Sequence, residues 1–172
     1  MIGGKQQKKV VEFKDLGDAL QVVSQAFQTN KGQEIVKGQI FKHLNDQLIN
    51  LSDNKFITPM EPILKKVQQK INKFELTEDW KNGLLAVEWC IEHQLVQQGI
   101  TMLQETVLTC YCIQFGLDYK NYRKRGLVKD AFFLKEGKRD WKPNARRNEA
   151  IIRRIFSEIT PNILSLFNEL TK

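Results

Sequence analysis

The chain has 172 residues, of which 41% are hydrophobic and 27% are charged, a composition typical of a soluble globular protein with its own core. No apolar run approaches the roughly 20 residues that span a membrane, and residues 1–9 lack the apolar stretch of a secretory signal. The formal net charge is +7, yet thirteen Lys or Arg against four Asp or Glu give a local net charge of +9 between Tyr119 and Arg154. A charge confined in this way favours a polyanionic partner.

Apolar residues recur at helical spacing through the first third of the chain. Residues 1–9 have no such pattern and are expected to form a loose tail, so residues 10–172 are predicted to form a single helical domain. A first helix is indicated by the apolar series Leu16, Leu20, Val23 and Phe27. The same spacing continues from Ile35 to about Leu51, and residues 52–54 then break it.

Two helix starts are predicted in the middle of the chain. Thr58 precedes Pro59 and is followed three residues later by Glu61, which is typical of a capped first turn. Acidic residues follow Thr77, where the helix dipole favours them. Two apolar stripes then run up to Phe115 and predict a helical hairpin, or one kinked helix, interrupted at Gly99.

The last third is predicted to be more irregular. Gly126, Gly137 and Pro143 interrupt the basic stretch, a helix is expected from near Asn144 to Phe156, and Thr160 is expected to start a final turn. No run of alternating residues between turns indicates a strand. The sequence therefore predicts an all-α protein, a bundle of roughly six to eight helices.

Cysteine and histidine give no sign of metal or redox chemistry. The three cysteines, Cys90, Cys110 and Cys112, lie in apolar periodic segments and are expected to be free, buried thiols in a reducing cytoplasm. Neither histidine has the spacing of a zinc ligand, so no metal or cofactor is expected. His93 is interpreted as a helix-end residue bonded to the backbone, with a proton donor in a composite site as the alternative.

Aromatic residues are interleaved with the cations of the basic stretch. Rings can stack on bases while cations meet phosphates, so the stretch predicts a surface for single-stranded nucleic acid. The aromatic residues concerned are Tyr119, Tyr122, Phe132, Phe133 and Trp141. The alternative is a solvated basic helix–loop–helix whose rings lie in the core.

Residues 86–105, AVEWCIEHQLVQQGITMLQE, resemble the helical C-terminal HEPN region of CRISPR-associated proteins of type III systems. Residues 13–18, FKDLGD, resemble the opening of the same region, and the likeness covers most of residues 13–115. The resemblance implies a HEPN-like fold, a homodimer, a role in antiviral defence in a prokaryotic cytoplasm, and binding of single-stranded RNA. It also implies metal-independent endoribonuclease activity.

The catalytic motif of that family opens with Arg and Asn and closes with His. Arg147 and Asn148 match the opening and are the candidate catalytic residues, but Ile152 stands at the His position and no His follows His93. Whether the chain is an enzyme is therefore left open. The family's CARF domain, which would bind a cyclic oligoadenylate, is not recognised in this sequence.

Phosphate contacts are expected from cations that the resemblance and the charge pattern both favour, since Arg binds phosphate bidentately. The predicted RNA-binding residues are Arg146, Arg147, Arg153, Arg154, Lys124, Arg125 and Lys142. Three other interpretations stay open: a non-catalytic binding or dimerisation module of the same family, a tetratricopeptide-like adaptor for an acidic protein segment, and a plain structural domain.

Overall fold

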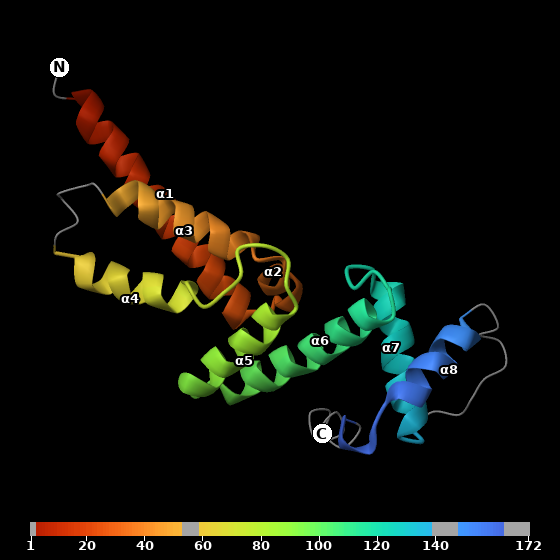
Figure 1. Ribbon diagram of the computed structural model, residues 1–172. Helices are drawn as coiled ribbons and strands as arrows, with labels where there is room; N and C mark the ends of the chain where they lie inside the picture. Colours follow the sequence, from red (N-terminus) through yellow and green to blue (C-terminus); the bar gives the residue numbers. More distant parts are fainter. Residues whose placement is uncertain (1–2, 53–58, 139–147, 164–172) are drawn as a thin grey trace. The chain divides into compact units, whose positions relative to one another are not determined.

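The computed structural model describes residues 3–52, 59–138 and 148–163, and every regular element in these ranges is a helix (Figure 1). The helices are α1 (Gly3–Gln28), α2 (Gly32–Lys37), α3 (Gln39–Ser52), α4 (Glu61–Ile71), α5 (Lys81–Glu92), α6 (Val96–Gln114), α7 (Tyr122–Lys135) and α8 (Glu149–Glu158). A further helical turn begins at residue 161. The prediction of an all-α protein is confirmed, and no helix among the described residues has the length and apolarity to cross a membrane.

The chain divides into two compact units, each with its own core. Unit 1 is Met1–Gly99 and unit 2 is Ile100–Lys172. The single domain over residues 10–172 stays a prediction. Helix α1 begins at Gly3, so most of the segment expected to be a tail is helical. Its Lys and Gln residues are good helix formers, which explains how the helix extends without an apolar stripe.

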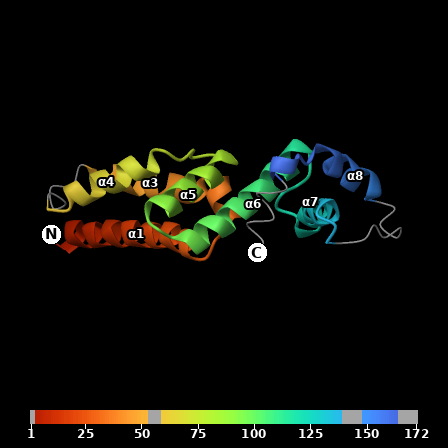
Figure 2. The same cartoon turned by 90° about the horizontal axis from the view of Figure 1, so that it is seen from below.

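Unit 1 is held together by aromatic rings between α1, α3 and the segment after α4. Helices α1 and α3 lie side by side in both views (Figures 1 and 2). Phe41 of α3 stacks on Phe74 with ring centroids 4.1 Å apart, and Phe27 of α1 meets both rings edge-on at 6.5 and 6.2 Å. All three rings are buried, so burial and ring geometry both stabilise this core.

The segment between α4 and α5 is fixed by backbone contacts. Asn82 is fully buried: its side-chain amide donates to the Glu75 carbonyl at 3.0 Å, and its carbonyl accepts from the Glu75 N–H at 2.8 Å. The N–H of Asp79 donates to the carbonyl of Val36 at 2.9 Å. Gly38 has φ +73°, and a Cβ there would lie 2.5 Å from the Thr77 carbonyl oxygen. Only glycine fits this approach.

Unit 2 contains the rest of α6 together with α7 and α8. Helices α7 and α8 pack against each other, and Phe132 and Ile155 are fully buried in the core of this unit. Tyr111 of α6 meets the Phe132 ring edge-on with centroids 5.2 Å apart. Asn121 caps α7, because its side-chain oxygen accepts from the N–H of Arg123 at 2.9 Å.

Two glycines expected to interrupt helices lie inside them. Gly99 belongs to α6, and the chain reverses before it, at Gln94 with φ +58°. A Cβ on Gly99 would lie 3.2 Å from that of Cys90, so this glycine lets α5 come close to α6. Gly126 lies in the middle of α7 with open space beside it, whereas Gly137, with φ +70°, follows the helix end as predicted.

Replacement of Gly38 by Ala is expected to destabilise unit 1 by at least about 2 kcal/mol, because the new methyl group meets backbone oxygens in a left-handed residue. Urea unfolding followed by circular dichroism measures the change. The control is Gly17→Ala in α1, where a Cβ meets nothing within 4 Å and the unfolding free energy should stay equal or rise. Equal effects at the two positions would contradict the proposed close approach.

Candidate nucleic-acid interface

The first turn of α7 carries an exposed aromatic residue that has cations near it in the sequence. Lys120 precedes the helix, and Tyr122 and Arg123 form its first residues. The Tyr122 side chain is 87% exposed, the highest value among the large hydrophobic residues that the structure describes. Lys120 and Arg123 are exposed as well. An exposed ring with exposed cations two residues before it and one residue after it is a pattern that can stack on a base while the cations meet phosphates.

Four residues on one side of α7 continue this surface, and we name them the α7 outer face: Tyr122, Gly126, Lys129 and Phe133. Their spacing of four, three and four residues aligns them along the helix. The Lys129 ammonium lies over the Phe133 ring, 5.5 Å from its centroid. Gly126 leaves the backbone accessible between Tyr122 and Lys129, since a Cβ there would meet nothing within 4 Å. Arg123 and Asp130 flank the face.

Arg125, one of the predicted RNA-binding residues, points into unit 2. It is 8% exposed, and its guanidinium donates to the Thr109 hydroxyl at 2.9 Å and to the Glu105 carboxylate at 2.5 Å. A longer bond of 3.4 Å reaches the Tyr119 carbonyl. These partners lie on α6 and on the segment before α7. We therefore leave Arg125 out of the proposed RNA-binding set and give it a structural role.

Lys124, beside Arg125, is half-buried. Its backbone N–H donates to the capping side chain of Asn121 at 3.4 Å, so its main chain helps to start the helix. The ammonium is not part of the α7 outer face. Lys124 stays a predicted RNA-binding residue on its charge alone.

The two described arginines of α8 have partners within unit 2. Arg153 forms an ion pair with Glu149, one turn earlier, with nitrogen–oxygen distances of 2.8 and 2.9 Å. Arg154 lies over the Phe115 ring, 5.4 Å from its centroid. Both side chains are exposed, and the Arg153 side chain is 63% accessible, so each remains able to meet an anion at the cost of its present contact.

The structure describes the candidate catalytic motif only from Asn148 onward. Arg146, Arg147 and Lys142 lie outside the described residues, as does Trp141. Asn148 is the N-cap of α8 and makes no side-chain capping hydrogen bond. Ile152, at the motif's His position, is 5% exposed and faces the core of unit 2. A position that faces the core suits an alkyl side chain better than a group that exchanges protons with substrate.

The other aromatic residues of the basic stretch divide between core and surface. Tyr119 and Phe132 are buried, and Phe133 is partly exposed. Among the aromatic residues of the basic stretch that the structure describes, Tyr122 is therefore the most exposed to solvent. The sequence pattern grouped all the aromatics together, whereas the spacing from Tyr122 to Phe133 would have singled out the exposed pair.

His93 lies at the end of α5 in unit 1. Its Nδ1 is 2.8 Å from the carbonyl oxygen of Trp89, and its ring stacks on the Trp89 indole with centroids 4.2 Å apart. The interpretation of His93 as a helix-end residue bonded to the backbone agrees with this geometry. Its hydrogen bond and its stack hold the ring against its own helix.

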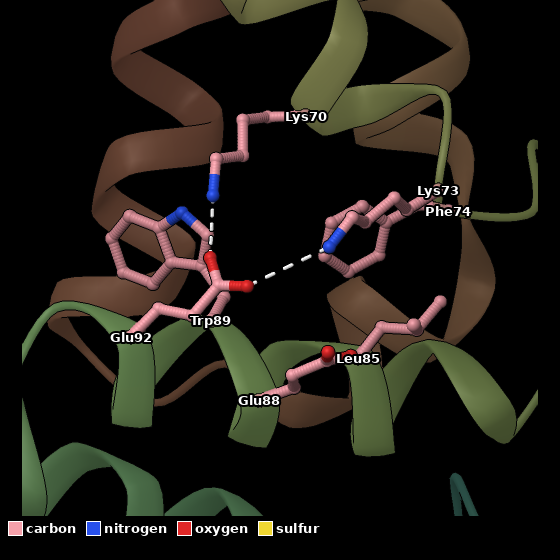
Figure 3. A pocket seen from close by; sticks show the side chains of 7 residues that line it. All are labelled: Lys70, Lys73, Phe74, Leu85, Glu88, Trp89 and Glu92. Carbon is pink, nitrogen blue, oxygen red and sulfur yellow. Dashed lines mark hydrogen bonds and ion pairs between the residues drawn. The ribbon is translucent and has the colours of Figure 1, made fainter.

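A shallow pocket in unit 1 lies between α5 and the end of α4 (Figure 3). Glu92 lies between the ammonium groups of Lys70 and Lys73, accepting a hydrogen bond from Lys70 and lying 3.6 Å from Lys73. The hydrogen bond from Lys70 is the main cause that holds the pKa of Glu92 below its usual value. Trp89 and Phe74 line the apolar side. Because Glu88 and Glu92 together balance the charges of the two lysines that line it, the pocket offers little field to an anion.

The cysteines are free, as predicted, and none is an activated nucleophile. Cys90 and Cys112 are fully buried, as expected, but Cys110 is partly exposed, so the prediction that all three thiols are buried is wrong at this position. Burial raises the pKa of all three thiols, for Cys112 to about 11, although the nearby charge of Arg125 acts in the opposite direction. Among the described residues no cluster of His, Cys, Asp or Glu could hold a metal ion.

Comparison of the chain with protein-family models, with curated proteins and with solved structures gives no match.

Arg125→Met is expected to lower the free energy of unfolding of unit 2 by about 2 kcal/mol, since the Glu105 carboxylate and the Thr109 hydroxyl lose their partner. Denaturant unfolding measures the loss. The matched control is Arg123→Met, two residues away on the same helix and exposed, which should change stability by no more than about 0.5 kcal/mol. Similar values for the two variants would contradict a structural role for Arg125.

Native maleimide labelling at neutral pH is expected to modify Cys110 at least about tenfold faster than Cys112, because only Cys110 has solvent access and the thiolate of Cys112 is more strongly disfavoured. Peptide mass spectrometry of samples quenched over time measures both rates. Labelling in denaturant should make the two rates equal. A native Cys112 that reacts as fast as Cys110 would show that this part of α6 is not buried as described.

Proposed function

We propose that unit 2 binds single-stranded RNA on the α7 outer face, with Lys120 and Arg123 meeting phosphates beside it. The observation that carries the proposal is the Tyr122 ring, which is 87% exposed beside these cations. A single exposed ring is ordinary on a protein surface, so it is the cations next to Tyr122 in the sequence that favour an anionic partner. A nucleobase is the partner that also suits the neighbouring positive charge.

The arrangement favours a single strand over a duplex. Stacking of one base on a tyrosine contributes on the order of 1–3 kcal/mol, and it requires a base that is not already stacked on both sides. Gly126 leaves room for a ribose or a second base against the helix backbone between Tyr122 and Lys129. Lys129 over Phe133 gives the same pairing of cation and ring at the other end of the face.

The family resemblance favours the same ligand by another route. The resemblance of residues 86–105 leads us to propose a HEPN-type domain of a CRISPR-associated type III protein, acting as a homodimer in a prokaryotic cytoplasm. Within that family we propose a binding module without cleavage activity. The burial of Ile152 supports this choice, because a proton-transferring group at that position would lie in the core.

Binding of a fluorescent single-stranded RNA, measured by anisotropy, tests the proposal. Tyr122→Ala is expected to weaken binding roughly 5- to 100-fold through lost stacking, whereas Tyr122→Phe should keep most of the affinity. Gly126→Glu should weaken binding as well, because it places a carboxylate on the face that meets phosphates. Gly17→Glu in α1 is the matched control, since both glycines have open space beside them.

Two further readouts separate the alternatives. Affinity for RNA should fall steeply as the salt concentration rises, and an acidic peptide should not bind. An adaptor for acidic protein segments would instead bind the peptide and not the RNA. Gel analysis of RNA incubated with the chain and EDTA should show no cleavage, and products that disappear in Arg147→Ala would instead establish the nuclease. Unchanged RNA affinity in both Tyr122→Ala and Gly126→Glu would overturn the proposed surface.

A further inference from the structure

Asn82 is followed by Gly83, and this is the one Asn-Gly pair among the 172 residues of the chain. Asparagine is a chemically labile residue, and asparagine before glycine is especially prone to deamidation, because glycine has no Cβ to obstruct attack on the asparagine side chain. Both residues are buried at the start of α5. The folded state of unit 1 therefore determines whether this pair reacts.

The reaction needs only the chain and water. The backbone nitrogen of Gly83 loses its proton and attacks the side-chain carbon Cγ of Asn82. The new carbon–nitrogen bond closes a succinimide ring, and the side-chain nitrogen takes up a proton and leaves as ammonia. Water then adds to one of the two ring carbonyls and opens the ring. The product is aspartate when the new bond breaks, or isoaspartate when the original peptide bond to Gly83 breaks.

Three hydrogen bonds keep the reacting atoms apart in the folded chain. The N–H of Gly83 donates to the carbonyl of Trp80 at 3.0 Å, so the attacking nitrogen is held in the first turn of α5. The side-chain amide of Asn82 donates to the Glu75 carbonyl at 3.0 Å, and its oxygen accepts from the Glu75 N–H at 2.8 Å. Ring closure requires these bonds to break and the backbone of Asn82 to leave its helical conformation.

The partners of Asn82 are themselves held in place. The carbonyl oxygen of Glu75 lies against Gly38, where a Cβ would be 2.6 Å from it. The N–H of Asp79 donates to the carbonyl of Val36 at 2.9 Å. Opening the site therefore requires the segment between α4 and α5 to come away, and not only the rotation of one side chain. All these residues belong to unit 1, so the site is independent of RNA binding by α7.

Deamidation removes the donor on which this contact depends. A carboxylate at position 82 accepts hydrogen bonds but donates none, and one of its oxygens would face the Glu75 carbonyl oxygen. The side chain is 0% exposed, so the new charge would be buried against a second acceptor. Isoaspartate also lengthens the main chain by the Cβ carbon in the first turn of α5.

We propose that Asn82–Gly83 is a deamidation site that the fold of unit 1 protects, and that its reaction in the unfolded chain makes unfolding of unit 1 irreversible. Chemical change of the unfolded chain competes with refolding, so the lifetime of the protein depends on how often this segment opens.

The first experiment incubates the full chain at mildly alkaline pH with and without guanidinium chloride. Deamidation is located by peptide mass spectrometry after digestion with pepsin in acid, where the reaction is slow. Asn82 should be converted at least about tenfold more slowly in the folded chain, because it reacts only in the opened fraction. In denaturant, Gly83→Ala should slow the conversion roughly tenfold or more, since its methyl group obstructs the attack. Equal rates for the folded and unfolded wild-type chain would overturn the protection.

The second experiment returns chains to native buffer after increasing times in denaturant, with a thiol reductant that keeps the free cysteines reduced. Refolded and misfolded chains are separated by size-exclusion chromatography, and each fraction is mapped for deamidation. The yield of refolded chain should fall in proportion to the conversion of Asn82, with the modified chains in the misfolded fraction. Modified chains that refold as well as unmodified ones would overturn the irreversibility.

The third experiment introduces the deamidated side chain directly. Asn82→Asp should raise the equilibrium constant for unfolding of unit 1 at least about tenfold at neutral pH, and complete loss of folding is the same result in stronger form. The matched control is Asn50→Asp in α3, where the side chain is exposed and the constant should change by less than about threefold. Equal effects of the two variants would show that a carboxylate at position 82 is tolerated, and would overturn the proposal.

Discussion

A buried guanidinium needs acceptors for its N–H groups, and Arg125 finds them on α6 and on the segment before α7. This requirement and the burial of the apolar residues of α7 agree on which side of the helix faces inward. Because Arg125 and Phe132 turn toward the core, Tyr122 and Lys129 are left on the solvent side of the same helix. The surface that we propose for RNA is thus the side of α7 that this inner face leaves in solvent.

Much of the fold could be predicted from the sequence, because helical periodicity and chain breaks are local signals. The apolar spacing of α1, α3 and α5 and the lack of alternating segments were sufficient for the all-α class. Glycine positions were less informative. Glycine in an apolar pattern predicts a helix break at Gly99 and Gly126, but both lie inside helices. Gly99 allows close packing against Cys90, whereas Gly126 lies on an open helix side, and both reasons depend on neighbours in space.

The candidate site was harder to predict for a similar reason. Charge and aromatic content locate the basic stretch, but they do not tell which cation is buried and paired within the protein. The pairing of Arg125 with Glu105 joins residues twenty positions apart on two helices, and no local pattern marks it. Tyr122 could have been singled out by its spacing from Gly126, Lys129 and Phe133, which is itself a local signal.

The close fit at Gly38 has a consequence for the order in which unit 1 assembles. The backbone around Thr77 rests against Gly38, and Asp79 is bonded to Val36, so these contacts join segments about forty residues apart. Closing a loop of this length costs chain entropy, and this cost comes before the contacts that close the loop can stabilise it. We therefore expect the turn at Gly38, between α2 and α3, to form early in folding. The segment before α5, which includes Thr77 and Asp79, is expected to pack against it late.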